Sequence, residues 1–282
     1  MLNKDFYIEY IDGIPCKLKT PFDLSFVNKY GKVFKVFDEQ RSGNLCFGTE
    51  KNGQRYFVKF AGAPTINSGD LLELLEHLES AAVVYQELAH PLLIRLVLSE
   101  KIGGGYSAVF EWTNAVCAGR DYPESRARFM ALPQGNHVKV FEDIMTFHAH
   151  VAEKGYVAVD FYDGSIMYDF AQSKIIICDI DLYQKAPYTG GLGRWDSADD
   201  FAQFFSPEEL TQDAVLDEIT TVYTMGQTAF ELFADSNRLP EAWTLSAETY
   251  ALIKRAVSND RDQRQQSIGQ LINEWKSAMS VE

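Results

Sequence analysis

The chain has 282 residues, 46% hydrophobic and 23% charged, and a formal net charge of −14. This length fits one large domain or two modest ones, and the composition is ordinary for a soluble globular protein. The negative charge argues against nonspecific nucleic-acid binding, which needs a basic surface, but a local lysine with Mg²⁺ can still hold a nucleotide.

No apolar run is long enough for a membrane helix, and the first ten residues lack the apolar segment of a secretion signal. The four cysteines show no CxxC spacing, which favours buried thiols in a reducing compartment over disulfides or zinc. We therefore expect a cytoplasmic protein with neither membrane nor nucleic-acid partners.

The first half of the chain predicts an antiparallel meander. Asp12-Gly13 and Asn52-Gly53 are strong turn signals between apolar runs, so each predicts a hairpin. The predicted strands cover residues 6–19 as a hairpin, 31–38, 45–50, 55–60, 92–100 and 105–112.

Residues 68–91 interrupt this meander with a predicted helix. Ser68 is the expected N-cap, and Pro91 ends the segment. Apolar residues at helical spacing form one face of it, namely Leu71, Leu74, Leu75, Leu78, Ala82 and Tyr85.

The second half is mostly helical. Residues 136–154 predict a helix that ends at Gly155, and its His148 and His150 point in different directions, so both are interpreted as structural surface histidines rather than a metal pair. Residues 217–233 and 268–275 predict further helices, and the segment 182–210 predicts a long loop.

An apolar strand containing residues 175–178 ends in Asp179-Ile180-Asp181, just after a loop that contains Asp160, Asp163 and Ser165. Carboxylates at the end of a buried strand are unfavourable unless a cation offsets them. A base on a loop near a carboxylate pair is what metal-assisted phosphoryl transfer requires.

These residues resemble the catalytic and metal loops of protein-kinase-like enzymes, whose pattern is His-Arg-Asp-x-x-x-x-Asn followed by Asp-Phe-Gly. Asp160 matches the catalytic Asp, Ser165 replaces the Asn, and Asp179 matches the metal Asp. Ala158 and Val159 replace His-Arg, and Asp181 replaces the Gly, giving an Asp-x-Asp similar to that of aminoglycoside phosphotransferases.

Other landmarks follow in the order of that family over residues 31–282. Phe57-Val58-Lys59 resembles Val-Ala-Ile-Lys, and Ser206-Pro207-Glu208 resembles Ala-Pro-Glu. Residues 221–226 resemble Asp-x-Trp-Ser-x-Gly, and residues 260–264 resemble Asp-Pro-x-x-Arg. The last resemblance predicts an ion pair between Glu208 and Arg264.

The resemblance implies an α+β, bilobal protein-kinase-like fold. A small antiparallel β lobe with one helix would span residues 1–112, including an additional hairpin region in residues 1–30. A larger, mainly helical lobe would span residues 113–282 and carry the catalytic, metal-binding and activation-like loops.

It also implies a site for ATP and Mg²⁺. Asp160 would accept the proton of the acceptor hydroxyl, Lys59 would neutralise the phosphates next to the metal held by Asp179, and Glu79 is the candidate partner of Lys59. The remaining implied metal ligands are Asp181 and Ser165, and the other nucleotide-binding residues are Gly43, Leu45, Phe110, Glu111 and Thr113.

Three functions remain open. The Ser-Pro-Glu element favours an enzyme similar to bacterial serine/threonine protein kinases, with a protein hydroxyl as acceptor. The Asp-x-Asp element favours a small-molecule kinase of the aminoglycoside type. The absent His-Arg pair, the glycine-poor phosphate loop and Ser165 favour a pseudokinase or nucleotide-binding scaffold.

Overall fold

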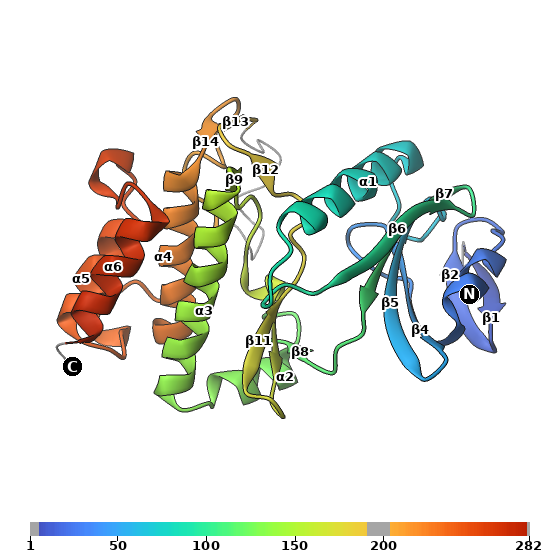
Figure 1. Ribbon diagram of the computed structural model, residues 1–282, viewed down its shortest axis with the longest axis horizontal. Coiled ribbons are helices and arrows are strands. Elements are labelled where there is room, and N and C mark those ends of the chain that lie inside the picture. The colour runs from blue at the N-terminus through green and yellow to red at the C-terminus, as the bar shows by residue number, and fades with distance from the viewer. Residues whose placement is uncertain (1–5, 191–203, 281–282) are drawn as a thin grey trace, which may run out of the picture. The chain divides into compact units, whose positions relative to one another are not determined.

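The computed structural model describes residues 6–190 and 204–280 (Figure 1). The chain divides into two compact units, Met1–Asn114 and Ala115–Glu282, with the division close to the expected boundary between residues 112 and 113. Helices combine with antiparallel sheets, so the protein is α+β as predicted.

Unit Met1–Asn114 contains a five-stranded antiparallel sheet and a separate hairpin. In the sheet order β3-β4-β5-β7-β6, short connections join β3 to β4, β4 to β5 and β6 to β7, whereas β5 pairs with the non-sequential β7 and residues 62–95 connect it to β6. The turns at Asp12-Gly13 and Asn52-Gly53 form as predicted. The strands are β1 Tyr7–Ile11, β2 Ile14–Leu18, β3 Lys32–Phe37, β4 Leu45–Lys51, β5 Gln54–Ala61, β6 Leu96–Ile102 and β7 Gly105–Glu111.

The two faces of this sheet have different coverings. One face joins the hairpin β1-β2 and the 3₁₀ helix Ser25–Tyr30 in a common core that includes Phe47 and Phe60. Helix α1, Leu71–Glu87, contacts β5, β6 and β7, and its Tyr85 ring lies 4.8 Å from the Phe110 ring. Figure 1 shows α1 running beside β6 and β7.

Helix α1 begins later than the sequence predicts. Its N-cap is Asp70, whose carboxylate accepts hydrogen bonds from Leu72 N at 2.8 Å and Glu73 N at 3.3 Å. Ser68 was the wrong choice because its hydroxyl donates instead to the Thr65 carbonyl at 2.9 Å, within a preceding turn. Asp and Ser are equally good caps, so the sequence alone did not separate them.

Unit Ala115–Glu282 is organised around helix α4, Glu218–Ala234, in which every residue from Thr220 to Ala234 is buried. Helices α3, α5 and α6 pack on it, and the Phe141, Phe233 and Trp275 rings meet where α3, α4 and α6 join. The other helices of this unit are α2 Pro123–Met130, α3 Gln134–Glu153, α5 Ala247–Ala256, α6 Ile268–Met279 and the 3₁₀ turns Pro240–Ala242 and Arg261–Gln263.

Short strands carry the loops of this unit. They form a sheet of order β11-β10-β8 and the pairs β12-β9 and β13-β14, all antiparallel among the described residues. The strands are β8 Val116–Cys117, β9 Tyr156–Val157, β10 Ile166–Asp169, β11 Lys174–Ile177, β12 Gln184–Lys185, β13 Tyr188–Thr189 and β14 Val215–Leu216. The predicted long loop 182–210 thus contains two short strands, and its residues 191–203 lie outside the described residues.

The expectation that His148 and His150 lie at the surface was wrong. His148 is fully buried, with Nδ1 2.8 Å from the Ile144 carbonyl oxygen and Nε2 2.8 Å from the Tyr183 hydroxyl, while His150 is half-buried. Burial lowers the pKa of His148 to about 4. The segment around Tyr183, far along the chain, covers this face of α3, which helical periodicity could not indicate.

No helix within the described ranges is both long and apolar enough to cross a membrane.

The close packing of α4 on α5 makes Gly226 a sensitive position. A Cβ at Gly226 would lie 2.6 Å from Val257 Cγ1 and 3.0 Å from Ala256 Cβ. We predict that Gly226→Ala lowers the free energy of unfolding by about 1–3 kcal/mol through overpacking. Urea denaturation measures this, with Gly135→Ala on α3 as the control, because nothing lies within 4 Å of a Cβ there. Equal stability of the two variants would contradict the packing shown.

Candidate functional site

Asp160 lies on the loop that follows β9 and is anchored on both sides. On one side, the Ala158 N–H donates to Thr221 Oγ1 in α4 at 3.1 Å. On the other, the Phe161 side chain is buried with its ring 4.5 Å from that of His148. Asp160 itself has φ of +63°, a left-handed conformation that Asp adopts more readily than most residues. The half-buried carboxylate is therefore presented by a rigid support.

The hairpin β10-β11 brings Asp179 back to this loop. Ile166 pairs with Ile177, and the next hydrogen bond, from Cys178 N to the Ser165 carbonyl at 2.9 Å, continues this pairing beyond the strand end. Strand β11 ends at Ile177, one residue earlier than predicted, and Asp179 follows with φ of +55°. A turn that includes residues 171–173 joins β10 to β11, with Asp169 Oδ1 accepting from the N–H groups of residues 171 and 172.

The electrostatics show that several carboxylates gather around Asp160. Burial raises the pKa of Asp160 to about 8, and the negative charges of Asp179, Glu209 and Asp181 add to that effect in this order. Burial and all three charges raise the pKa of Asp160. The loop and the strand end therefore come together as the sequence predicts, and they concentrate negative charge.

This donor set fits Mg²⁺. Magnesium is bound by one or two carboxylates together with water and substrate phosphates, rather than by a complete protein cage. No cluster of three His, Cys, Asp or Glu side chains able to hold a metal occurs in residues 6–190 and 204–280. Asp179 and Asp181 are the residues that would hold the ion, and Asp160 shares their field.

Ser165 is fully buried at the end of the 3₁₀ turn Asp163–Ser165. Its hydroxyl accepts a long hydrogen bond, 3.5 Å, from Tyr162 N, so it closes the turn in the loop that follows β9. A role for Ser165 as a metal ligand stays a prediction.

Tyr162 is a site residue that the sequence reasoning missed. Its hydroxyl donates to Asp179 Oδ2 at 3.4 Å, and burial together with the charge of Asp179 raises its pKa strongly. A Cβ at Gly164 would lie only 2.3 Å from the Tyr162 ring, so the glycine lets the ring lie against the loop. The Tyr-x-Gly spacing is the signal that could have indicated this arrangement.

The predicted ion pair between Glu208 and Arg264 is confirmed. Arg264 Nη1 lies 2.6 Å from Glu208 Oε1, and Arg264 Nη2 lies 3.0 Å from Glu208 Oε2, so the contact is bidentate and buried. Arg261 adds a bond to Glu208 Oε1 at 2.6 Å and one to Asp217 Oδ1 at 2.6 Å. Burial acts to raise the pKa of Glu208, but the Arg264 hydrogen bonds and charge hold it below its ordinary value.

Glu209, the residue after Glu208, was also missed by the sequence reasoning. It is buried, its Oε2 accepts from Ser206 N at 2.7 Å, and its own N–H donates to Ser206 Oγ at 3.2 Å. Burial raises its pKa to about 7. The sequence offered no signal for its proximity to Asp160, because the two residues come together only through tertiary packing.

In unit Met1–Asn114, Lys59 is half-buried on β5 and paired with Cys46 on β4 and Ala108 on β7. The alternation along β5 places Phe57 on the same face, and Phe110 lies opposite Phe57. Leu45 faces the other way, into the core with Phe60. The geometry therefore favours Cys46 over Leu45 as the β4 residue beside a group bound by Lys59.

Three further predicted residues have other contacts in this unit. Gly43 has φ of +79°, and a Cβ there would lie 2.9 Å from Ser68 Cα, so its close backbone approach is to the chain itself. The Glu111 N–H donates to the Arg95 carbonyl at 3.0 Å, so this backbone donor is already in use. Glu79 Oε1 lies 3.1 Å from Lys101 Nζ, so the carboxylate predicted for Lys59 pairs with another lysine. Thr113 lies just beyond the end of β7.

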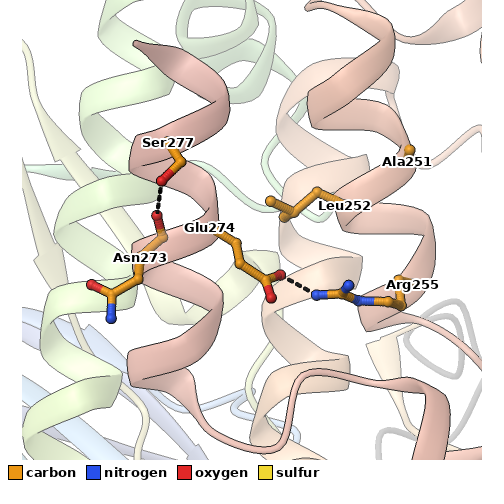
Figure 2. A pocket seen from close by; sticks show the side chains of 6 residues that line it. All are labelled: Ala251, Leu252, Arg255, Asn273, Glu274 and Ser277. Atoms are coloured by element: carbon orange, nitrogen blue, oxygen red, sulfur yellow. Dashed lines mark hydrogen bonds and ion pairs between the residues drawn. The ribbon is translucent and has the colours of Figure 1, made fainter. Parts of the chain in front are cut away.

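A cavity of about 450 Å³ lies elsewhere, between α5 and α6 (Figure 2). Its charged residues, Arg255 and Glu274, pair with each other across the space, and Ser277 donates to the Asn273 carbonyl at 2.9 Å. Because none of the predicted site residues lines it, this cavity is not the candidate site.

Comparison with known proteins does not assign the chain to a family. No protein-family model matches the chain, and no curated protein sequence is significantly similar to it.

The Glu208–Arg264 pair generates a stability prediction. Glu208→Gln leaves the fully buried Arg264 guanidinium without a counter-charge at that contact, so we expect a loss of about 3–5 kcal/mol in the free energy of unfolding. Glu274→Gln, in the more exposed pair with Arg255, serves as the control, with an expected loss below about 1 kcal/mol. Chemical denaturation of both variants checks this, and a Glu208→Gln loss as small as the control loss would contradict it.

The raised pKa of Asp160 generates a pH prediction. A carboxyl whose folded pKa exceeds its unfolded pKa destabilises the fold increasingly as pH rises between the two values, here from about 4 to about 8. Asp160→Asn removes this penalty, so the variant gains stability over the parent by up to about 1.4 kcal/mol per pH unit in that window. Asn is chosen because it tolerates the left-handed conformation of Asp160.

Urea denaturation of both proteins at pH 5 and pH 8 measures the difference. Asp143→Asn, on the outer part of α3 in a pair with Lys139, is the control and is expected to show little pH-dependent gain. A stability difference between Asp160→Asn and the parent that is the same at both pH values would exclude the buried carboxylate cluster.

Proposed function

We propose that the protein is an ATP- and Mg²⁺-dependent phosphotransferase with a bilobal fold of the protein-kinase type, which transfers the γ-phosphate to a hydroxyl group. The observation that carries this proposal is that the loop of Asp160 continues the pairing of β10 with β11, through the Cys178 N–H and the Ser165 carbonyl at 2.9 Å, and so lies beside Asp179 and Asp181. Burial, with the charges of Asp179, Glu209 and Asp181, raises the pKa of Asp160 to about 8. Burial of the Asp160 carboxylate beside like charges costs stability, so a functional role accounts for it better than a structural one.

The bidentate Glu208–Arg264 contact supports the same proposal from a separate part of the chain. It was expected only because of the resemblance in residues 206–208 and 260–264. Two unrelated surface charges would not have produced a buried bidentate contact at a separation of 56 residues.

The roles of the residues are those that the resemblance to protein-kinase-like enzymes implies. Asp160 would orient the acceptor hydroxyl and accept its proton, while Lys59 would bind the phosphates. Asp179 and Asp181 would hold Mg²⁺, which when bound would offset the charge on the phosphates and the negative field that raises the pKa of Asp160. The hydroxyl of Tyr162 would keep the Asp179 carboxylate oriented.

A second function, nucleotide binding without efficient transfer, is favoured by Gly43. The missing side chain of that glycine accommodates the backbone of Ser68, so the one glycine at a phosphate-loop position has a structural reason to be there. Backbone approach to phosphates normally needs such glycines. The acceptor, whether a protein or a small molecule, is assigned by the assay below.

The proposal predicts Mg²⁺-dependent transfer of label from γ-labelled ATP, and loss of that transfer in Asp160→Asn by about 10²–10⁴-fold. Label recovered on protein assigns a protein kinase, and label recovered on a metabolite from an extract assigns a small-molecule kinase. Asp143→Asn is the matched control and is expected to transfer label at the parent rate.

Calorimetric titration of ATP with and without Mg²⁺ separates the two functions. Mg²⁺-dependent heat without label transfer would leave only the nucleotide-binding function. The absence of both binding heat and a thermal shift at millimolar Mg-ATP would contradict both functions. An Asp160→Asn variant as active as the parent would remove Asp160 from the role of base.

A further inference from the structure

A buried group of opposite charges lies on the catalytic loop, outside the residues assigned to the reaction. It consists of Arg120, Arg126, Asp163, Glu231 and Asp235, here called the arginine cluster. Asp163 and Glu231 are almost completely buried, and only Asp235 is well exposed. The cluster joins three elements of the same unit, namely the segment around α2, the loop of Asp160 and the end of α4.

The contacts of Asp163 hold the loop in place. Asp163 Oδ2 accepts from Arg120 N at 2.9 Å and from Arg126 Nη1 at 3.4 Å. The two guanidinium groups are in turn paired with Glu231, and Arg126 Nη2 also lies 2.6 Å from Asp235 Oδ1. Asp163 therefore connects the loop to α4 through both arginines.

Backbone packing reinforces this connection. A Cβ at Gly119 would lie 2.9 Å from Gly164 Cα and 3.0 Å from Gly164 N, so the chain before Arg120 lies directly against the loop. The Cys117 thiol donates to the Gly164 carbonyl at 3.5 Å. The middle of the loop, between Asp160 and Ser165, is thus in contact with this segment through both side chains and backbone.

A cluster of this kind fixes the orientation of the loop more than it stabilises the fold. Burying charged groups carries a desolvation penalty of several kcal/mol per ion, which ion pairs offset only when the geometry is complete. Here it is incomplete, because the buried Asp163 Oδ1 has no hydrogen-bond partner. A hydrophobic contact would stabilise the fold better, but it would not fix the loop in one orientation.

We propose that Arg120 and Arg126 are positioning residues, which act through Asp163 and Glu231 to hold the loop 160–165 in the conformation that presents Asp160. Their role in catalysis rests on the proposed phosphotransferase function, whereas their effect on the loop does not.

The test compares Arg126→Gln with Arg128→Gln, an identical change two residues along the same helix. Arg128 is exposed and stacks on Phe170 at 3.7 Å, away from the cluster. Hydrogen exchange followed by mass spectrometry reads peptides covering residues 156–166 in the full chain. We expect exchange there to accelerate on the order of tenfold in Arg126→Gln, and to stay at the parent rate in Arg128→Gln.

Arg126→Gln leaves two buried carboxylates with less positive charge and could unfold the protein. The double variant Arg126→Gln/Glu231→Gln removes one charge of each sign and keeps the buried net charge unchanged, so it tests the same contact in a folded chain. Unchanged exchange at residues 156–166 in the double variant would overturn the proposal.

Kinetics give the second readout. We expect kcat to fall about 10–100-fold in the double variant with a smaller change in KM for Mg-ATP, because the loop that presents Asp160 is displaced while β11 keeps its pairing with β10. Accelerated exchange with an unchanged kcat would overturn the positioning role. If the parent shows no transfer while exchange responds as expected, the proposed function fails and the effect of the arginines on the loop stands.

Discussion

The constraint on which the second unit depends is the burial of the Asp160 and Glu209 carboxylates near the acidic end of β11. Burial, with the charges of Asp179, Glu209 and Asp181, raises the pKa of Asp160 to about 8, and burial, with the charge of Glu208, raises the pKa of Glu209 to about 7. Like charges in a low-dielectric environment repel, so the fold must hold them together by other means. A bound cation would relieve this repulsion, which links the buried carboxylates to the proposed function.

Helix α4 provides contacts that hold these segments together at three places along its length. Asp217, at its N-cap, receives Arg261 and so ties the helix to the Glu208 network. One turn further on, Thr221 holds the backbone just before Asp160. Near the C-terminus, Glu231 pairs with the arginines that hold Asp163. A single buried helix thus positions the loop, the segment after residue 204 and the arginine cluster.

The predictability of these features depended on how local they are. Hairpins with Asp-Gly or Asn-Gly turns follow from short-range pattern, as do a helix that ends two residues before Gly155 and a strand that ends two residues before Asp179. The Glu208–Arg264 pair was predicted from a motif resemblance. Tyr162, Glu209 and Arg126 were missed because their partners lie far along the chain, and His148 was misplaced because a segment 35 residues away covers it. The prediction for Leu45 shows a related weakness, because its side chain lies on the face of β4 opposite to that of Cys46 and a shift of one residue reverses the face of a strand.

The most direct test is a crystal structure of the full chain grown with Mn²⁺, in place of Mg²⁺, and a non-hydrolysable ATP analogue. The account predicts an anomalous scattering peak coordinated by the carboxylates of Asp179 and Asp181, with the nucleotide phosphates completing its coordination and Asp160 left free to face the terminal phosphate. A peak at another position, or no peak and no nucleotide at the end of β11 in crystals grown with millimolar amounts of both, would contradict it.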